Sequence, residues 1–190
     1  MTYAKVDEKG EMLIESIPNK GDREIFQIAQ YFLKSHFNSR DGLKEIGVVR
    51  TNKLAHAEYA EWLVAKLLNG TLPKSSVNKG FDVEVLENKK KIKYEVKCRL
   101  IDKLNKNPAF HVKIKKDNNR KPFDHVACVF LTPTFEVLGV FTITYDALIE
   151  VGEKDKRDEF RRSLRWNKTN INKYKKHIEW VWQDKKFAEN

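Results

Sequence analysis

Cysteine and histidine are scarce in this sequence, and none of them has the spacing of a metal site or a known catalytic unit. Cys98 and Cys128 each lie inside an apolar run, with no CxxC pair, so neither a disulfide framework nor a zinc site is indicated. The five histidines show no HExxH or HxH pattern, and no Ser-x-Gly turn for nucleophilic hydrolysis is present. Chemistry based on zinc or on a serine nucleophile is therefore not expected.

Long apolar segments are also missing. No stretch approaches the roughly 18 apolar residues of a membrane helix, and residues 1–20 lack the basic start, apolar run and cleavage site of a signal peptide. No repeat with a period of about 20 to 50 residues is visible. We expect a single soluble, cytoplasmic domain over residues 1–190, with added segments at both ends.

Acidic residues are outnumbered by basic residues, 27 to 37, so the net charge is +10 and the pI is about 9.5. A surplus of basic residues favours binding to polyanions, which makes nucleic acid the leading candidate partner. The alternative is a lysine-rich surface without a ligand, because 28 of the 37 basic residues are lysines.

Hydrophobic spacing divides the chain into a helical start, a central run of strands and a helical end. Helix spacing covers residues 21–37 and about 52–68, with a loop over 38–47. Strand patterns cover residues 81–86, 91–100, 109–115, 125–132 and 136–144. Residues 146–151 and 158–166 are expected to be helical. The predicted core is therefore about 52–143, with helical additions over 1–51 and 144–190.

One predicted hairpin brings two carboxylates together. Side chains two apart on a strand share a face, so Glu95 and Lys97 lie on the polar face of the strand 91–100. If the turn is centred within the polar stretch ENKK, Asp82 lies directly opposite Glu95, and Glu84 lies opposite Lys93. Opposed like charges destabilise a sheet, so something must compensate for them.

A hard divalent cation such as Mg²⁺ would compensate for the two acids, and Mn²⁺ can take the same ligands. Lys97 would then orient or deprotonate an attacking water and neutralise charge at a phosphorus centre. The Glu-x-Lys pattern alone carries no weight, because an acid two before a lysine occurs at four places, beginning at Asp7, Glu87, Glu95 and Asp184. Only the copy at Glu95 lies in an alternating strand with an acid at hairpin distance. The alternative is a solvent-facing strand with alternating charges.

These residues resemble the PD-(D/E)xK nuclease superfamily, which includes restriction endonucleases and Holliday-junction resolvases. The resemblance covers about residues 52–143 and implies a restriction-endonuclease-like α/β fold, a mixed sheet flanked by helices. In that superfamily the two acids, here Asp82 and Glu95, bind Mg²⁺, and the lysine, here Lys97, is catalytic. Two departures are visible: Phe81 stands where the motif has proline, and no long crossover helix is evident between the strands 91–100 and 125–132.

The resemblance also implies a metal-binding glutamate on the preceding helix. The stretch HAEYAEWLVAKLLNG matches the family's helix pattern at Ala57, Glu58 and Ala60, so Glu58 is the candidate and Glu61 is a rival. The carbonyl of Val96 is a further candidate ligand, since it lies between two site residues.

Several basic residues near these motifs are candidates for DNA contacts. Arg99 continues the charged face beyond Lys97, and an arginine fork suits phosphate. The other candidates are Lys79, Lys113, Lys115 and Arg120. The tryptophans of the C-terminal segment, Trp166, Trp180 and Trp182, are expected to pack a terminal helix onto the core rather than to stack on bases.

The sequence therefore predicts a Mg²⁺-dependent DNA endonuclease, with a type II restriction enzyme as the first choice and double-stranded DNA as the substrate. A resolvase or a DNase toxin of the same fold remains an alternative. A non-catalytic nucleic-acid-binding module is the alternative from another class. Cutting both strands with one site per chain favours a homodimer.

Overall fold

The computed structural model describes residues 31, 35–36, 38–50, 55–74, 80–101, 107–114 and 120–184. The chain divides into two compact units, Met1–Gly47 and Val48–Asn190. In the first unit residues 38–45 are helical, where a loop was expected over 38–47, and the helix expected over 21–37 lies almost wholly outside the described residues. All the named helices and strands belong to the second unit.

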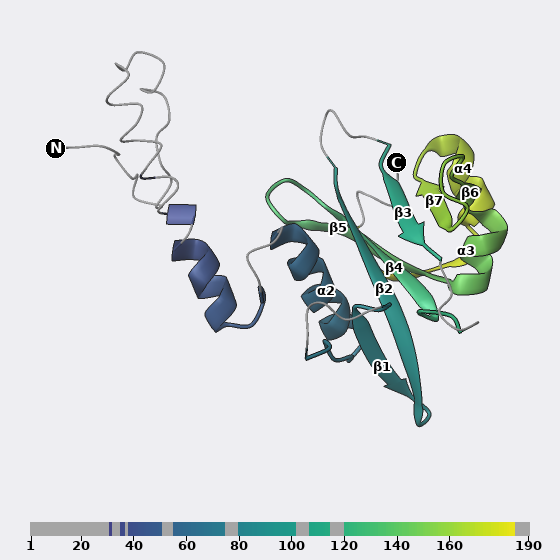
Figure 1. Ribbon diagram of the computed structural model, residues 1–190. Coiled ribbons are helices and arrows are strands. Elements are labelled where there is room, and N and C mark those ends of the chain that lie inside the picture. The colour runs from purple at the N-terminus through teal and green to yellow at the C-terminus, as the bar shows by residue number, and fades with distance from the viewer. Residues whose placement is uncertain are drawn as a thin grey trace, which may run out of the picture. The chain divides into compact units, whose positions relative to one another are not determined.

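The second unit is a mixed α/β structure built on two sheets (Figure 1). Its elements are α2 (Ala55–Leu67), β1 (Val83–Glu87), β2 (Lys90–Leu100), β3 (Ala109–Lys113), β4 (His125–Leu131), β5 (Val137–Thr144), α3 (Tyr145–Val151), β6 (Glu153–Lys154), β7 (Arg161–Arg165), α4 (Lys168–Tyr174) and β8 (Ile178–Gln183). The large sheet has the order β1-β2-β4-β5-β8 and the small sheet the order β3-β7-β6. The β2–β4 pair is parallel and the other pairs are antiparallel. The prediction of a mixed sheet flanked by helices is confirmed.

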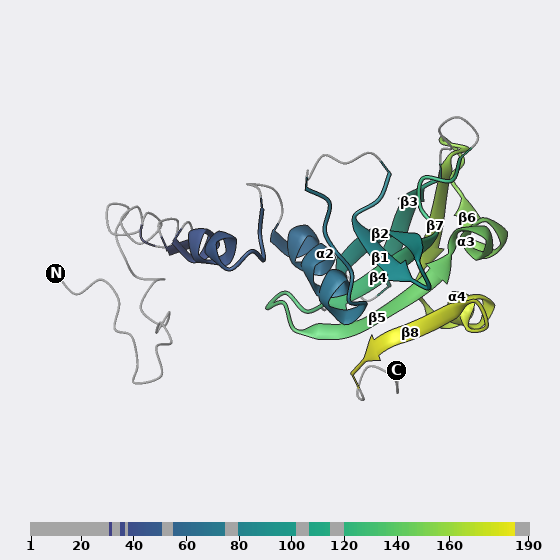
Figure 2. The same ribbon diagram turned by 90° about the horizontal axis from the view of Figure 1, so that it is seen from below.

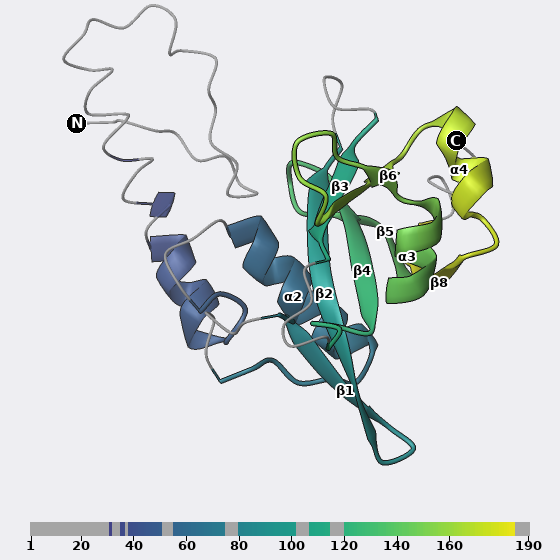
Figure 3. The same ribbon diagram turned by 45° about the vertical axis from the view of Figure 1, so that its right-hand side comes forward.

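Helix α2 and the small sheet cover opposite faces of the large sheet (Figure 3). On one face, Ala60 and Val64 of α2 belong to a buried cluster with the inward residues of β1, β2 and β4. On the other face, Phe110 of the small sheet packs against Phe130 and Phe141, with ring centroids 5.0 and 6.0 Å away. Strand β4 is buried on both faces, as its continuous apolar run predicts.

The β1–β2 hairpin has the predicted register. Glu84 pairs with Lys93 and Glu87 pairs with Lys90, so the loop consists of Asn88 and Lys89. These two residues have φ values of 48° and 66°. Positive φ at both positions is the requirement of a type I′ turn, whose twist matches that of the flanking strands.

The C-terminal end of α2 is fixed against β1 by a close backbone approach. A Cβ atom on Gly70 would lie 2.9 Å from the carbonyl oxygen of Glu84 and from side-chain carbons of Val83 and Val85, so only glycine fits. Thr71 then forms a β-bridge with Glu84. This contact sets the position of α2, and of the glutamates it carries, relative to the hairpin.

The helical C-terminal addition expected over 144–190 is wrong for most of its length. Residues 158–166, expected to be helical, contain β7, in which Arg162 and Leu164 are buried and Arg161 and Arg165 are not. Because the inward position 162 is an arginine, the sequence does not show the alternation of apolar and polar residues that indicates a strand. Strand β8 likewise pairs with β5 and completes the large sheet at its edge (Figure 2).

Two of the three tryptophans of this segment pack into the core, but not from a terminal helix as expected, because Trp180 and Trp182 lie on β8 and Trp166 follows β7. Trp166 and Trp180 contact each other with ring centroids 5.7 Å apart, and both contact Phe141. Trp182 on β8 is 38% exposed. Residues 161–183 are therefore part of the core and not an addition to it.

Candidate active site

Asp82 lies where the β1–β2 ladder ends. The last pair of the ladder is Val83 opposite Tyr94, so Asp82 lies one residue beyond it, and the pairing of Asp82 with Glu95 stays a prediction. The amide of Asp82 still donates to the carbonyl of Tyr94 at 2.8 Å, but the Asp82 carboxylate then replaces the next main-chain partner. Its Oδ2 accepts the N–H of Val96 at 2.8 Å. This hydrogen bond fixes the Asp82 carboxylate at the edge of β2.

Glu95 and Lys97 form an ion pair on the polar face of β2, between Nζ of the lysine and Oε1 of the glutamate. Their side chains are 20% and 25% exposed, so the pair is shielded from bulk water. Cys98 and Val96 point to the opposite, apolar face, which packs toward α2. The alternation read from the sequence is therefore confirmed for β2.

The pKa values of both carboxylates are raised. Burial raises the pKa of Glu95, the negative charge of Asp82 raises it further, and Lys97 opposes both effects. Burial also raises the pKa of Asp82, against the N–H of Val96 and the positive charges of Lys97 and Arg50. Asp82, Glu95 and Lys97 thus form one electrostatically coupled cluster.

Helix α2 contributes two glutamates held by one arginine. The N–H of Arg50 donates to Oε2 of Glu58 at 3.0 Å, and the Arg50 guanidinium forms an ion pair with Glu61. A second guanidinium nitrogen donates to the carbonyl of Pro73 at 3.1 Å. Burial raises the pKa of Glu61 to about 7, and the charge of Asp82 is the next cause.

Glu61 therefore lies near Asp82, with Arg50 beside it. Glu58 is 5% exposed and interacts with the main chain of Arg50. Glu58 stays the predicted metal-binding glutamate from the sequence pattern, and the structure adds that the charge of Asp82 raises the pKa of Glu61. Sequence reasoning missed Arg50, because its partners are 8 and 11 residues further along the chain and no spacing rule links them.

Among the residues described, no group of three or more His, Cys, Asp and Glu side chains has the geometry of a metal site. The carboxylates instead bond to the protein itself: Asp82 to an amide, Glu95 to Lys97 and Glu61 to Arg50. The N–H of Val96 points toward Asp82, and the carbonyl of a strand residue points to the same edge as its N–H, so the carbonyl predicted as a ligand lies on the Asp82 side of β2.

The residues predicted to contact DNA have different positions. Arg99 lies two residues beyond Lys97 on β2, and its guanidinium donates to the carbonyls of Ala109 at 2.8 Å and Cys98 at 2.7 Å. Lys113, at the end of β3, and Arg120 are exposed. Lys79 and Lys115 lie outside the described residues.

Comparison with protein-family models and with curated proteins finds no match for this chain. Over the part of the chain that the structure covers, none of the helices has both the length and the apolar character needed to cross a membrane.

Proposed function

We propose that this protein is a Mg²⁺-dependent DNA endonuclease, in which Asp82 and Glu95 hold the cation and Lys97 acts on the attacking water. One observation carries the proposal: two half-buried carboxylates, both with raised pKa values, lie with a lysine at the end of one hairpin ladder. Two half-buried acids whose pKa values are raised are costly in a structural role, and perturbed pKa values of this kind cluster at functional sites.

The chemistry of the donors fits Mg²⁺. This ion takes oxygen ligands, binds proteins through one or two carboxylates and keeps several waters for substrate phosphate to replace. Asp82 and Glu95 supply the carboxylates, and the Val96 carbonyl and Glu61 or Glu58 are further oxygen donors nearby. When bound, the cation would polarise the phosphoryl oxygens and stabilise the charge that develops on them.

The roles of the protein's own residues follow from their positions. Asp82 is fixed by the Val96 amide, so its free carboxylate oxygen is held without conformational cost. Lys97 is held by Glu95 on the same face of the strand, where its ammonium group can orient a water and neutralise the phosphorane-like transition state. Arg99 lies next along this face and suits a phosphate adjoining the scissile one.

The net charge of +10 supports DNA as the substrate class. Within that class, a type II restriction enzyme acting as a homodimer is the subclass that the sequence predicts. Incubation of the protein with supercoiled plasmid and Mg²⁺ tests the proposal. Discrete fragments would indicate a restriction enzyme, a smear would indicate a non-specific DNase, and cleavage of four-way junctions alone would indicate a resolvase.

Three substitutions and two matched controls make the assay specific. Asp82→Asn, Glu95→Gln and Lys97→Ala should each lower the cleavage rate by about 100-fold or more. The controls are Glu84→Gln and Lys93→Ala, an acid and a lysine on the same hairpin outside the cluster, and these should cleave at nearly the wild-type rate. If no DNA substrate is ever nicked, or if the controls lose activity equally, the proposal fails.

A further inference from the structure

The side of the small sheet that faces away from the core carries a group of polar and basic residues. We call it the outer basic face, and it consists of His111 and Lys113 on β3 and of Arg161 and Arg165 on β7, around the buried Ser163. The opposite side of the same two strands is buried through Phe110, Val112 and Leu164. The alternation of a strand thus separates the outer basic face from the hydrophobic core.

Like charges are directly opposed on the outer basic face. Lys113 is the cross-strand partner of Arg161, an arrangement that destabilises a sheet. Burial lowers the pKa of His111, and the next causes are the positive charges of Arg161 and Arg99, with a smaller one from Arg165. His111, which hydrogen-bonds to Ser163 at 2.8 Å, therefore has three arginines near it, and Asp155 is the acid that opposes them.

The acids near this face neutralise it weakly. Asp155 lies 3.6 Å from the Arg161 guanidinium, and Glu153 lies 3.9 Å from that of Arg165. The two arginine side chains are 39% and 51% exposed, and exposed ion pairs at these distances contribute little. No ion pair joins Lys113 to the residues that the structure describes. The outer basic face therefore has cationic groups that can bind an external anion.

Arg99 connects this face with the candidate active site. It lies on β2 two residues after Lys97, and its Nε donates to the carbonyl of Ala109, the first residue of β3, at 2.8 Å. The positive charge of Arg99 lowers the pKa of His111, which lies on β3 as Ala109 does. Arg99 therefore links the two regions: it follows Lys97 on the same face of β2, its guanidinium lies 6.0 Å from the ring centroid of Phe110 on the inner side of β3, and its charge reaches His111 on the outer side.

We propose that the outer basic face binds the sugar-phosphate backbone of double-stranded DNA and holds it across the candidate active site. Successive phosphates would meet Arg99 and then the β3–β7 cations, whose mutual repulsion the bound polyanion relieves. The contacts are with phosphate, so they give affinity and register but no sequence specificity. The identity of the polyanion rests on the proposed function; the existence of the surface does not.

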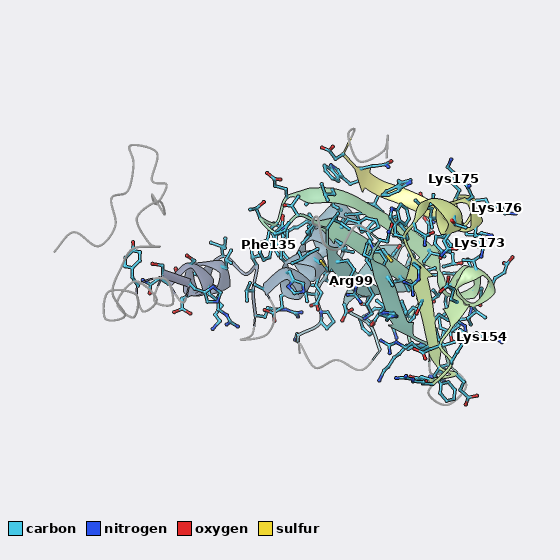
Figure 4. All side chains as sticks on the ribbon, turned by 90° about the horizontal axis from the view of Figure 1, so that it is seen from above. Arg99, Phe135, Lys154, Lys173, Lys175 and Lys176 are labelled. Atoms are coloured by element: carbon cyan, nitrogen blue, oxygen red, sulfur yellow. The ribbon has the colours of Figure 1, made fainter. Side chains whose placement is uncertain are left out.

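The test measures binding of a fluorescently labelled DNA duplex to the full chain by anisotropy, in EDTA and over a range of salt concentrations. The variant carries Lys113→Gln, Arg161→Gln and Arg165→Gln. The matched control carries Lys173→Gln, Lys175→Gln and Lys176→Gln, which remove the same charge from α4 and the turn after it, where Figure 4 shows the lysines at one end of the unit and away from Arg99. Thermal unfolding checks that both variants are folded.

The outer-face variant should bind DNA about 10-fold or more weakly at moderate salt, and the slope of log K against log[salt] should fall by about 2 to 3. The control should keep a slope near that of wild type. Equal losses in both variants, a loss in the α4 variant alone, or no DNA binding by wild type would each overturn the proposal. Plasmid nicking is scored separately, so a wild-type protein that binds through this face without nicking contradicts the proposed function and leaves the surface intact.

Discussion

The carboxylate of Asp82 accepts the main-chain N–H of Val96 at 2.8 Å, one step beyond the last paired residues of the β1–β2 ladder. A side chain here replaces a main-chain acceptor, which leaves the buried amide satisfied and places a negative charge at the edge of the sheet. The interaction has two separable parts, a hydrogen bond and a charge.

Asp82→Asn separates these two parts. Its amide oxygen can still accept from Val96, while the charge that opposes Glu95 is removed. Burial raises the pKa of both acids, and the charge of Asp82 raises that of Glu95 further, so we expect the thermal midpoint in EDTA to rise by a few degrees. Mg²⁺ should raise the midpoint of wild type and of Glu84→Gln, but not of Asp82→Asn. A lower midpoint for Asp82→Asn in EDTA would contradict the electrostatic account.

Arg50 and Glu61 should be energetically coupled. Arg50→Ala removes the ion pair with Glu61 and the bond to the Pro73 carbonyl, and should lower the free energy of unfolding by about 1–3 kcal/mol. In the double variant with Glu61→Gln the loss should be smaller than the sum of the single losses, because no carboxylate is left without its partner. Denaturant unfolding of the four proteins measures the coupling, and strict additivity would contradict it.

Glu61 should make stability depend on pH in metal-free buffer. Its pKa in the folded protein, about 7, is above its ordinary value, so the folded state binds the proton more tightly. The resulting stabilisation is fully present below about pH 4.5 and is lost as the pH rises through 7. Glu61→Gln should flatten the dependence of the unfolding free energy over this window. Glu136→Gln, at an exposed glutamate in the β4–β5 turn, should leave the curve unchanged.

Lys89 occupies a position that suits glycine. Its φ of 66° is left-handed, which costs a residue with a side chain roughly 1–2 kcal/mol. Lys89→Gly should therefore stabilise the protein by about 0.5–1 kcal/mol, since the extra entropy of glycine in the unfolded chain offsets part of the gain. The control is Lys90→Gly, within β2, which should destabilise by a similar amount. Chemical denaturation measures both, and a loss of stability in Lys89→Gly would contradict the assignment of the turn.

The hairpin and the position of its acids were predictable because they depend on local rules. A period of two assigns each side chain to a face, and a two-residue turn fixes which residues are opposite, so the pairing of Glu84 with Lys93 could be predicted from the sequence. The role of Arg50 was not predictable in this way. It depends on the approach of α2 to the residues before it, which is a tertiary contact.

The C-terminal strands were missed for a related reason. In β7 the inward position next to Leu164 is Arg162, which is only 7% exposed, and a buried arginine breaks the apolar alternation on which strand prediction relies. In β8 the alternation is visible between Ile178 and Trp182, but the lysines before it gave the segment a helical and basic character. Only its pairing with β5 makes it a strand.

The left-handed turn at Asn88 and Lys89 sets the register of the hairpin and therefore the positions of the candidate site residues on it. Asp82 lies six residues before Asn88, and Glu95 lies six residues after Lys89, so the positions of both acids depend on this turn. Inserting or deleting a single residue on one arm would rotate that arm by half a period, and Glu95 and Lys97 would then exchange places with Val96 and Cys98. The length of this short connection should therefore tolerate less change over evolution than many positions in the core.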